Sequence, residues 1–314
     1  MTSDTQHTAS SAALASARAG KSKTDSGLVP FLAGNAVLGT IGVFAHEAGT
    51  APMTLTWFRC AFGLLGITLW LRYRRQLPAL LLTRSTASYV MLAGSLMVIS
   101  WGLFFSAITR IPTGIAVVLF QIQPLWVLLL AAVFLKEAIR RRRVVSVSIA
   151  MVGLVLATGV LERFMMPAAG VAQAADYWWG VAACLVGALV TACVTIIARR
   201  LKGMPQGVLA WWQCALGTLL LWVWPMQHGW PQLGVSWLWL AGLGLIHTGL
   251  AYTLLYQGMG RLPAGRIAVL QYVYPAVAIV VDWLYFGHAL SPLQLAGILF
   301  MAMAIWIAER DRGI

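Results

Sequence analysis

Ten stretches of mainly apolar residues follow one another along the chain, separated by short breaks of charged residues, proline, glycine or polar clusters. Each stretch is close to the ~20 mostly apolar residues that a membrane-spanning helix needs. The pattern therefore predicts an all-α membrane protein with ten transmembrane helices. These are expected at residues 29–46, 54–71, 86–109, 112–135, 144–161, 177–198, 206–225, 234–257, 263–286 and 290–308.

The ends of the chain and two internal breaks complete this organisation. Residues 1–27 are small and polar and lack the apolar run of a secretory signal, which predicts a disordered cytoplasmic tail. Arg110, Pro112 and Gly114 interrupt an apolar stretch that is too long for one helix, and Pro263 and Gly265 do the same later. We expect two five-helix units at 28–161 and 177–308, and a second tail at 309–314.

Composition agrees with a membrane protein and excludes other classes. Hydrophobic residues make up 60% of the 314 residues and charged residues 10%, whereas soluble domains have about 45–50% and about 25%. This excludes a disordered chain, a fibrous repeat and an ordinary cytosolic enzyme. The four cysteines lie inside apolar stretches without metal-ligand spacing, so we expect free thiols and no metal site.

The basic residues predict the orientation in the membrane. A net charge of +13 could indicate nucleic-acid binding, but the basic residues lie in the breaks between apolar stretches. With a cytoplasmic N-terminus, 18 of the 22 Lys and Arg residues fall on the cytoplasmic side and two, Arg110 and Arg163, on the other. The positive-inside rule thus predicts that both termini are cytoplasmic.

The two halves of the chain resemble each other. A shift of 151 residues superimposes eight identical pairs between 103–138 and 254–289, among them Arg110/Arg261 and Pro124/Pro275. A shift of 154 superimposes further pairs, including Cys60/Cys214. Because each half has five helices, the second half must enter the membrane from the opposite side. Such inverted repeats are typical of transporters that bind substrate near the midplane between the halves.

Several motifs extend this reading to a known family. They are Thr56-Trp57-Phe58-Arg59, the segment Ala107–Gly114 (AITRIPTG), Gln121-Ile122-Gln123-Pro124 with Lys136-Glu137, and in the second half Arg261–Gly265 and Gln271–Pro275. In this order the chain resembles the drug/metabolite transporter superfamily, specifically its EamA-type ten-helix carriers, and is similar to the aromatic amino-acid exporters called YddG. In this family the ninth apolar segment, which is 263–286 here, is usually followed by Gly-Glu, whereas this chain has Gly287-His288. The resemblance implies a multi-pass carrier of the cell inner (plasma) membrane.

Polar and aromatic residues inside the apolar stretches are the candidate substrate-binding residues, because polar groups in lipid usually face a cavity or a partner. Arg59 could anchor a carboxylate or be structural, for example paired with Asp282, which could instead carry a proton. His247 could carry a proton or fill a packing site. Pro124 and Pro275 could act as hinges or as static bends. The candidates are Asn35, Arg59, Trp101, Gln121, Gln123, His247, Tyr252, Gln271, Tyr274 and Asp282.

These observations predict a secondary transporter that exports small metabolites, foremost amino acids including aromatic and apolar ones, by alternating access. Alternatives are a carrier of nucleosides, sugars or drugs, and an integral membrane enzyme that handles lipids. Nine acidic residues and no paired histidines disfavour the enzyme. Ala15–Ser22 fits a loose phosphate-loop pattern without its strand and helix, so no nucleotide is expected. The expected partners are a small-molecule substrate and the bilayer, with no cofactor and no nucleic acid; oligomeric state and energy coupling stay open.

Overall fold

The regular structure is helical throughout the part of the chain that the computed structural model describes, which is residues 26–310 except 112, 139, 159–174, 202, 206 and 288. A first helix over 26–39 leads through a turn into α2 (Ile41–Ala48). The remaining elements of the first half are α3 (Pro52–Tyr73), the 3₁₀ turn η1 (Leu77–Leu80), α4 (Arg84–Ile108), α5 (Thr113–Phe120), α6 (Gln123–Phe134) and α7 (Arg141–Ala157). Those of the second half are α9 (Ala175–Arg200), α10 (Val208–Leu221), α11 (Val223–His228), α12 (Val235–Gly242), the π-helical segment η2 (Leu243–Leu250), α13 (Ala251–Met259), α14 (Ala264–Leu270), α15 (Val273–Phe286) and α16 (Pro292–Arg310).

A helix lies at each of the ten predicted segments. Eight helical stretches among the described residues are long and apolar enough to cross a membrane. The other two are α7, which has 17 residues, and α16, whose apolar part is Pro292–Ile307. Residues 26 and 27, which were assigned to the predicted tail at 1–27, are helical, and Ser26 is the first residue that the structure describes. The rest of that tail, including Ala15–Ser22, lies outside the described residues, as do Arg163 and His288.

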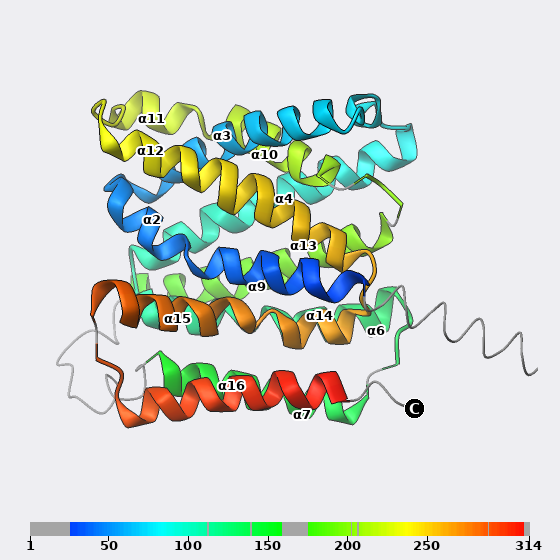
Figure 1. Ribbon diagram of the computed structural model, residues 1–314, viewed down its shortest axis with the longest axis vertical. Helices are drawn as coiled ribbons and strands as arrows, with labels where there is room; N and C mark the ends of the chain where they lie inside the picture. The colour runs from blue at the N-terminus through cyan, green and yellow to red at the C-terminus, as the bar shows by residue number, and fades with distance from the viewer. Residues whose placement is uncertain are drawn as a thin grey trace, which may run out of the picture.

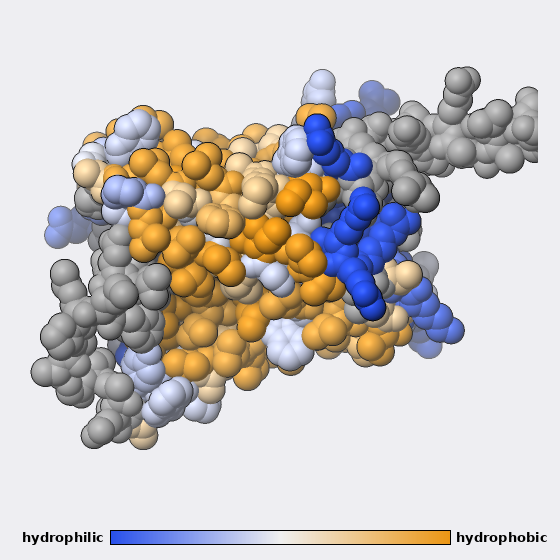
Figure 2. Space-filling view, turned by 90° about the horizontal axis from the view of Figure 1, so that it is seen from below, coloured by the Kyte–Doolittle hydropathy of each residue, from blue (hydrophilic) through white to orange (hydrophobic). Residues whose placement is uncertain are grey.

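The helices lie side by side with nearly parallel axes, as Figure 1 shows, with α3 and α10 towards one edge and α7 and α16 at the other. Large apolar side chains cover the outer surface, including Leu129, Leu238 and Leu299. Basic residues gather at one end of the bundle, which we call the basic end: there α3, α9 and α16 finish and α4 and α7 begin (Figure 2). An apolar belt with a charged end is the surface expected of a helix bundle in a bilayer.

Helices α3 and α10 pack antiparallel through reciprocal contacts. Gly217 lies against Cys60, whose Sγ is 2.6 Å from where a Cβ on Gly217 would be, and Gly63 lies against Cys214 at 3.3 Å. The Trp57 indole donates to the carbonyl of Thr218 at 3.0 Å, and that of Trp211 donates to Thr68 Oγ1 at 2.8 Å. In these two pairs, a contact of α3 on α10 has a counterpart of α10 on α3.

Two helices are broken near their middle, at matching positions of the two halves. A two-residue turn at Gln121 and Ile122 separates α5 from α6, and another at Gln271 and Tyr272 separates α14 from α15. A proline follows each break, Pro124 and Pro275, and proline cannot donate to the preceding helical turn. Both breaks face the centre of the bundle, because Gln121 and Gln271 line the same cavity.

Candidate functional site

A cavity of 240 Å³ lies between the two halves at the level of the helix breaks. Its wall combines residues from the first helix, α3, α4, α9, α13 and both breaks. Its volume is just below the roughly 300–1,000 Å³ typical of pockets for drug-sized ligands, so it suits a small metabolite. Eight of the ten predicted site residues line it: Asn35, Arg59, Trp101, Gln121, Gln123, Tyr252, Gln271 and Tyr274.

Arg59 of α3 is the one charged side chain among the described residues that line the cavity. Its Nη2 donates to the Tyr252 hydroxyl at 3.1 Å. Its guanidinium carbon lies 5.2 Å from the ring centre of Trp101 and 5.7 Å from that of Tyr252, so two aromatic rings hold the cation by cation–π attraction. Its Nε is buried without a hydrogen-bond partner. A buried donor without an acceptor is costly. An anionic group that entered the cavity would therefore be favoured, because it could accept a hydrogen bond from this guanidinium.

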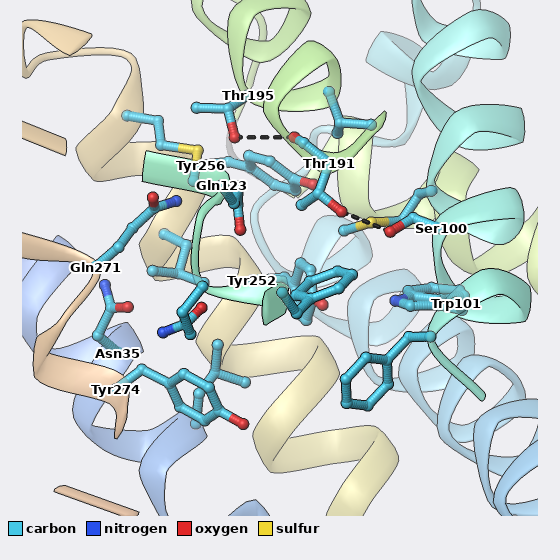
Figure 3. Close-up of a pocket in the computed structure, with 18 of the residues that line it drawn as sticks. Asn35, Ser100, Trp101, Gln123, Thr191, Thr195, Tyr252, Tyr256, Gln271 and Tyr274 are labelled. Atoms are coloured by element: carbon cyan, nitrogen blue, oxygen red, sulfur yellow. Dashed lines mark hydrogen bonds between the residues drawn. The ribbon is translucent and has the colours of Figure 1, made fainter. Parts of the chain in front are cut away.

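Amide side chains on the cavity wall supply hydrogen-bond acceptors, which complement the cationic Arg59. Figure 3 shows Asn35 and Gln271 across the pocket from Trp101. The Gln271 Oε1 is a buried acceptor without a partner, and the Gln121 Nε2 is a buried donor without one. The Asn35 amide nitrogen is bonded to the Phe31 carbonyl at 2.8 Å. The wall therefore offers an acceptor to a cationic group of a ligand as well as a guanidinium to an anionic one.

Sequence reasoning missed a row of hydroxyl groups on the wall formed by α4 and α9. Ser100 Oγ and Thr191 Oγ1 lie 2.5 Å apart, and Thr195 Oγ1 donates to the Thr191 carbonyl at 3.2 Å (Figure 3). Threonines four residues apart on a helix share one face, and this spacing could have indicated the row. Ser and Thr also bond to their own helix in membranes, as Thr191 does to the Gly187 carbonyl at 3.0 Å, so the spacing alone does not predict a site.

Residues at equivalent positions of the two halves meet in this cavity. With the 151-residue shift, four pairs have both members in the lining: Trp101/Tyr252, Phe104/Leu255, Phe120/Gln271 and Gln123/Tyr274. The two halves differ in charge at one such pair, because the counterpart of Arg59 under the 154-residue shift is the neutral Gln213. Gln213 is buried and accepts from the Tyr256 hydroxyl at 2.6 Å. The site therefore has pseudo-symmetric walls with a positive charge on the first half only.

His247 does not reach the cavity, contrary to the sequence-based expectation. It is fully buried, with Nε2 2.9 Å from Thr40 Oγ1 and its ring 4.5 Å from that of Phe44. Its contacts place it against the turn at Thr40 and against Phe44 of α2, whereas Tyr252 faces the cavity. The structure thus favours the alternative that His247 is a hydrogen-bonded packing residue.

Asp282 also lies outside the cavity, and it forms no pair with Arg59, which bonds to Tyr252 instead. In a continuous helix, Gln271, Pro275, Ala278 and Asp282 would share one face, at spacings of four, three and four residues. The turn at Gln271 and Tyr272 interrupts that helix, so the stripe does not continue into the cavity. Asp282 is half-buried two turns of α15 beyond Tyr274, at about 12 Å along the axis.

Comparisons with known proteins agree with this fold. The EamA-like transporter family matches residues 25–159 and 178–309, one copy in each half, and the chain belongs to this family of membrane transporters. It is 24% identical over 280 residues to the "Uncharacterized transporter YxxF" of Bacillus subtilis (strain 168), covering 88% of this chain and 87% of that protein. It is 26% identical over 215 residues to "Protein PecM" of Dickeya dadantii (strain 3937), covering 66% and 68%.

A second transporter and a solved structure extend the likeness. An "Uncharacterized transporter" of Archaeoglobus fulgidus is 24% identical over 278 residues, which cover 88% of this chain and 93% of that protein. A solved structure titled "Crystal structure of protein" superimposes with a TM-score of 0.79 at 21% identity, over 91% of this chain and 97% of that one. At this identity the structural likeness concerns the fold alone.

Proposed function

We propose that the protein is a secondary carrier that exports amino acids, including aromatic and apolar ones, across the inner membrane by alternating access. The observation that carries the proposal is the cavity wall, where Arg59 is held between Trp101 and Tyr252 with a buried Nε without a partner. A carboxylate is the natural partner of a guanidinium, because the two planar groups can form paired hydrogen bonds. The aromatic rings beside it would accommodate an apolar or aromatic side chain.

The ammonium group of an amino acid also has a partner in this cavity. Gln271 Oε1 is a buried acceptor, and its position across the pocket from Trp101 separates it from the guanidinium. Each charge of a zwitterion must regain hydrogen bonds when it leaves water. Amide oxygens are weaker partners than a carboxylate, so we expect broad specificity and apparent affinities on the order of millimolar.

Alternating access is supported by the relation between the halves. The reciprocal contacts of α3 and α10, the matching breaks, and the pairs at a 151-residue spacing are what a two-fold axis in the membrane plane would produce. In carriers with inverted repeats, two arrangements of the halves open the central site to opposite sides in turn. The helix breaks beside Pro124 and Pro275 are the proposed hinges, since they lack continuous helical hydrogen bonding.

Transport by the purified protein in liposomes tests the proposal. Labelled phenylalanine, leucine, uridine and glucose are offered to empty liposomes and to liposomes with protein, first without any ion gradient. We expect protein-dependent flux of phenylalanine and leucine that saturates in the millimolar range. Flux of only uridine or glucose would contradict an amino-acid carrier, and flux of none of them would contradict the proposed substrate class.

A further inference from the structure

A second cavity lies away from the central one, at the outer edge of the bundle between α7 and α16. The two helices run antiparallel and approach closely in their middle, where a Cβ on Gly153 would be 2.7 Å from the Gly297 carbonyl oxygen. Towards the basic end they leave a cavity of 400 Å³ between them, which we call the groove. Its lining is Arg141, Arg142, Val145, Trp306, Ile307 and Arg310.

Three guanidinium groups surround this cavity, and the chain holds them there by different means. Arg141 and Arg142 are in the first turn of the 17-residue helix α7, whose N-terminal end adds a partial positive charge. Arg310 stacks on Trp306, with its guanidinium carbon 3.7 Å from the ring centre. The neighbouring Arg143 instead lies against Gly265 of α14, inside the bundle. Of these consecutive arginines, Arg141 and Arg142 therefore line the groove, whereas Arg143 points into the bundle.

The rest of the lining is apolar and open to the surroundings of the bundle. Val145 is 52% exposed and Trp306 is 53% exposed, although both are large apolar side chains. Helices α7 and α16 form the outer layer on this side, and Figure 2 looks at that layer, with apolar residues over its middle and basic residues at one end. A ligand of this groove would touch guanidinium groups at the bundle end and apolar surface along the helices.

We propose that this groove binds an anionic phospholipid, with the headgroup phosphate among Arg141, Arg142 and Arg310 and the first part of an acyl chain over Val145 and Trp306. Guanidinium groups bind phosphate oxygens in pairs, and basic pockets between membrane helices are suited to anionic headgroups. A soluble phosphate would use the arginines but not the apolar floor. The proposal is independent of the substrate of the central cavity.

The chain offers a matched control at the same end of the bundle. Arg74 also stacks on a tryptophan, Trp70, at 4.7 Å, and Arg72 lies on the same helix end, yet none of these residues lines the groove. The double variant Arg141→Ala with Arg310→Ala and the double variant Arg72→Ala with Arg74→Ala remove the same charge. A diffuse attraction between a basic surface and anionic lipid would be weakened equally in both.

Lipid binding to the purified, full-length protein in neutral detergent tests the proposal. Lipid adducts are counted by native mass spectrometry during titration with phosphatidylglycerol, phosphatidylcholine or glycerol phosphate. We expect one phosphatidylglycerol to bind in preference to phosphatidylcholine, and roughly tenfold weaker binding by the Arg141/Arg310 variant but not by the Arg72/Arg74 variant. A variant with lysine at 141 and 310 should recover part of the affinity, because it keeps the charge but not the paired hydrogen bonds.

Three outcomes would overturn the proposal. Equal weakening in both alanine variants would show an unspecific surface charge effect. Equal binding of glycerol phosphate and phosphatidylglycerol would show a site for soluble anions. Equal binding of phosphatidylglycerol and phosphatidylcholine would show that the arginines do not select an anionic headgroup. A lipid-free melting curve for each variant separates these outcomes from misfolding.

Discussion

The hydroxyl of Tyr272 donates a hydrogen bond to the backbone carbonyl of Gln121 at 3.2 Å, and the two residues are 151 positions apart. This separation equals the shift that superimposes the two halves of the chain. Each residue belongs to the turn that breaks its helix. The bond therefore connects the two broken helices directly, at the turn where each helix changes from i→i−4 to i→i−3 backbone hydrogen bonds.

Loss of this bond should weaken the connection between the halves. We expect Tyr272→Phe to lower the free energy of unfolding by about 1 kcal/mol, since a buried carbonyl loses its partner while the ring packing stays. Thermal unfolding in detergent measures the change. Tyr89→Phe is the control, because Tyr89 is exposed on α4. An equal effect of both variants would show that the Tyr272–Gln121 bond contributes nothing of its own.

Replacement of Arg59 tests whether it binds the carboxylate of an amino acid. Arg59→Gln should reduce kcat/KM for amino acids by roughly 10- to 100-fold, the cost of a charged hydrogen bond, and should affect the matching amino alcohol, which has the ammonium group but no carboxylate, much less. Uptake by liposomes that contain the variant gives both values. The control is Arg110→Gln, whose guanidinium bonds to Ser106 outside the cavity. Equal losses for both substrates would mean that Arg59 is structural.

The close packing of α3 on α10 should make Gly217 sensitive to a single methyl group. Gly217→Ala places a Cβ 2.6 Å from Cys60 Sγ, and we expect a loss of about 1–3 kcal/mol in stability. Cys60→Ala in the same chain should restore most of that loss. At the reciprocal position, Gly63→Ala should not be rescued by Cys214→Ala, because its nearest neighbour is Thr248 at 2.8 Å. Melting temperatures of the single and double variants measure these couplings.

The predicted orientation, with both termini cytoplasmic, rests on the 18-to-two distribution of basic residues and can be tested directly. In a chain without its four cysteines, a cysteine in place of Gln232 should react with an impermeant maleimide added outside intact cells. A cysteine in place of Gln76, which follows α3 at the basic end, should react only after the membrane is permeabilised. The reverse pattern would invert the predicted orientation of every loop.

Transport by the central cavity should not depend on a proton gradient. Among the described lining residues there is no carboxyl or imidazole side chain that could exchange a proton with the substrate path. We therefore expect equal initial rates of phenylalanine uptake into liposomes with and without an imposed pH difference. A several-fold stimulation by the gradient would indicate that a titratable group outside this lining takes part, and Asp282→Asn would then identify or exclude that residue.

The sequence allowed the helices to be predicted because lipid imposes a simple length and composition on each of them. All ten segments coincide with helices, and the break before Pro124 was indicated by the proline itself. The extent of the break was not predictable, since the turn at Gln271 and Tyr272 depends on how the halves meet. The helical residues 26 and 27 were assigned to the tail because Ser26 and Gly27 are small and lack apolar side chains.

The site was predictable to the extent that a polar residue in a membrane-spanning helix must face a cavity or a hydrogen-bonding partner. That rule identified eight lining residues, but it did not distinguish a cavity from a packing partner. His247 satisfied the same rule with Thr40, a neighbour 207 residues away that no local pattern indicates. Ser100 was missed because a lone serine is common in apolar helices, and its partner Thr191 lies on another helix.

Arg59 is the one charge among the described residues of the cavity wall, and this sets a limit on what the proposed carrier can achieve. If transport uses none but these lining groups, a proton gradient cannot drive substrate against its own concentration gradient through this cavity. Net efflux would then stop when the concentrations on the two sides are equal. The protein would therefore release substrate down its concentration gradient, fastest when metabolism has produced an internal excess and ever more slowly as the internal level falls towards the external one.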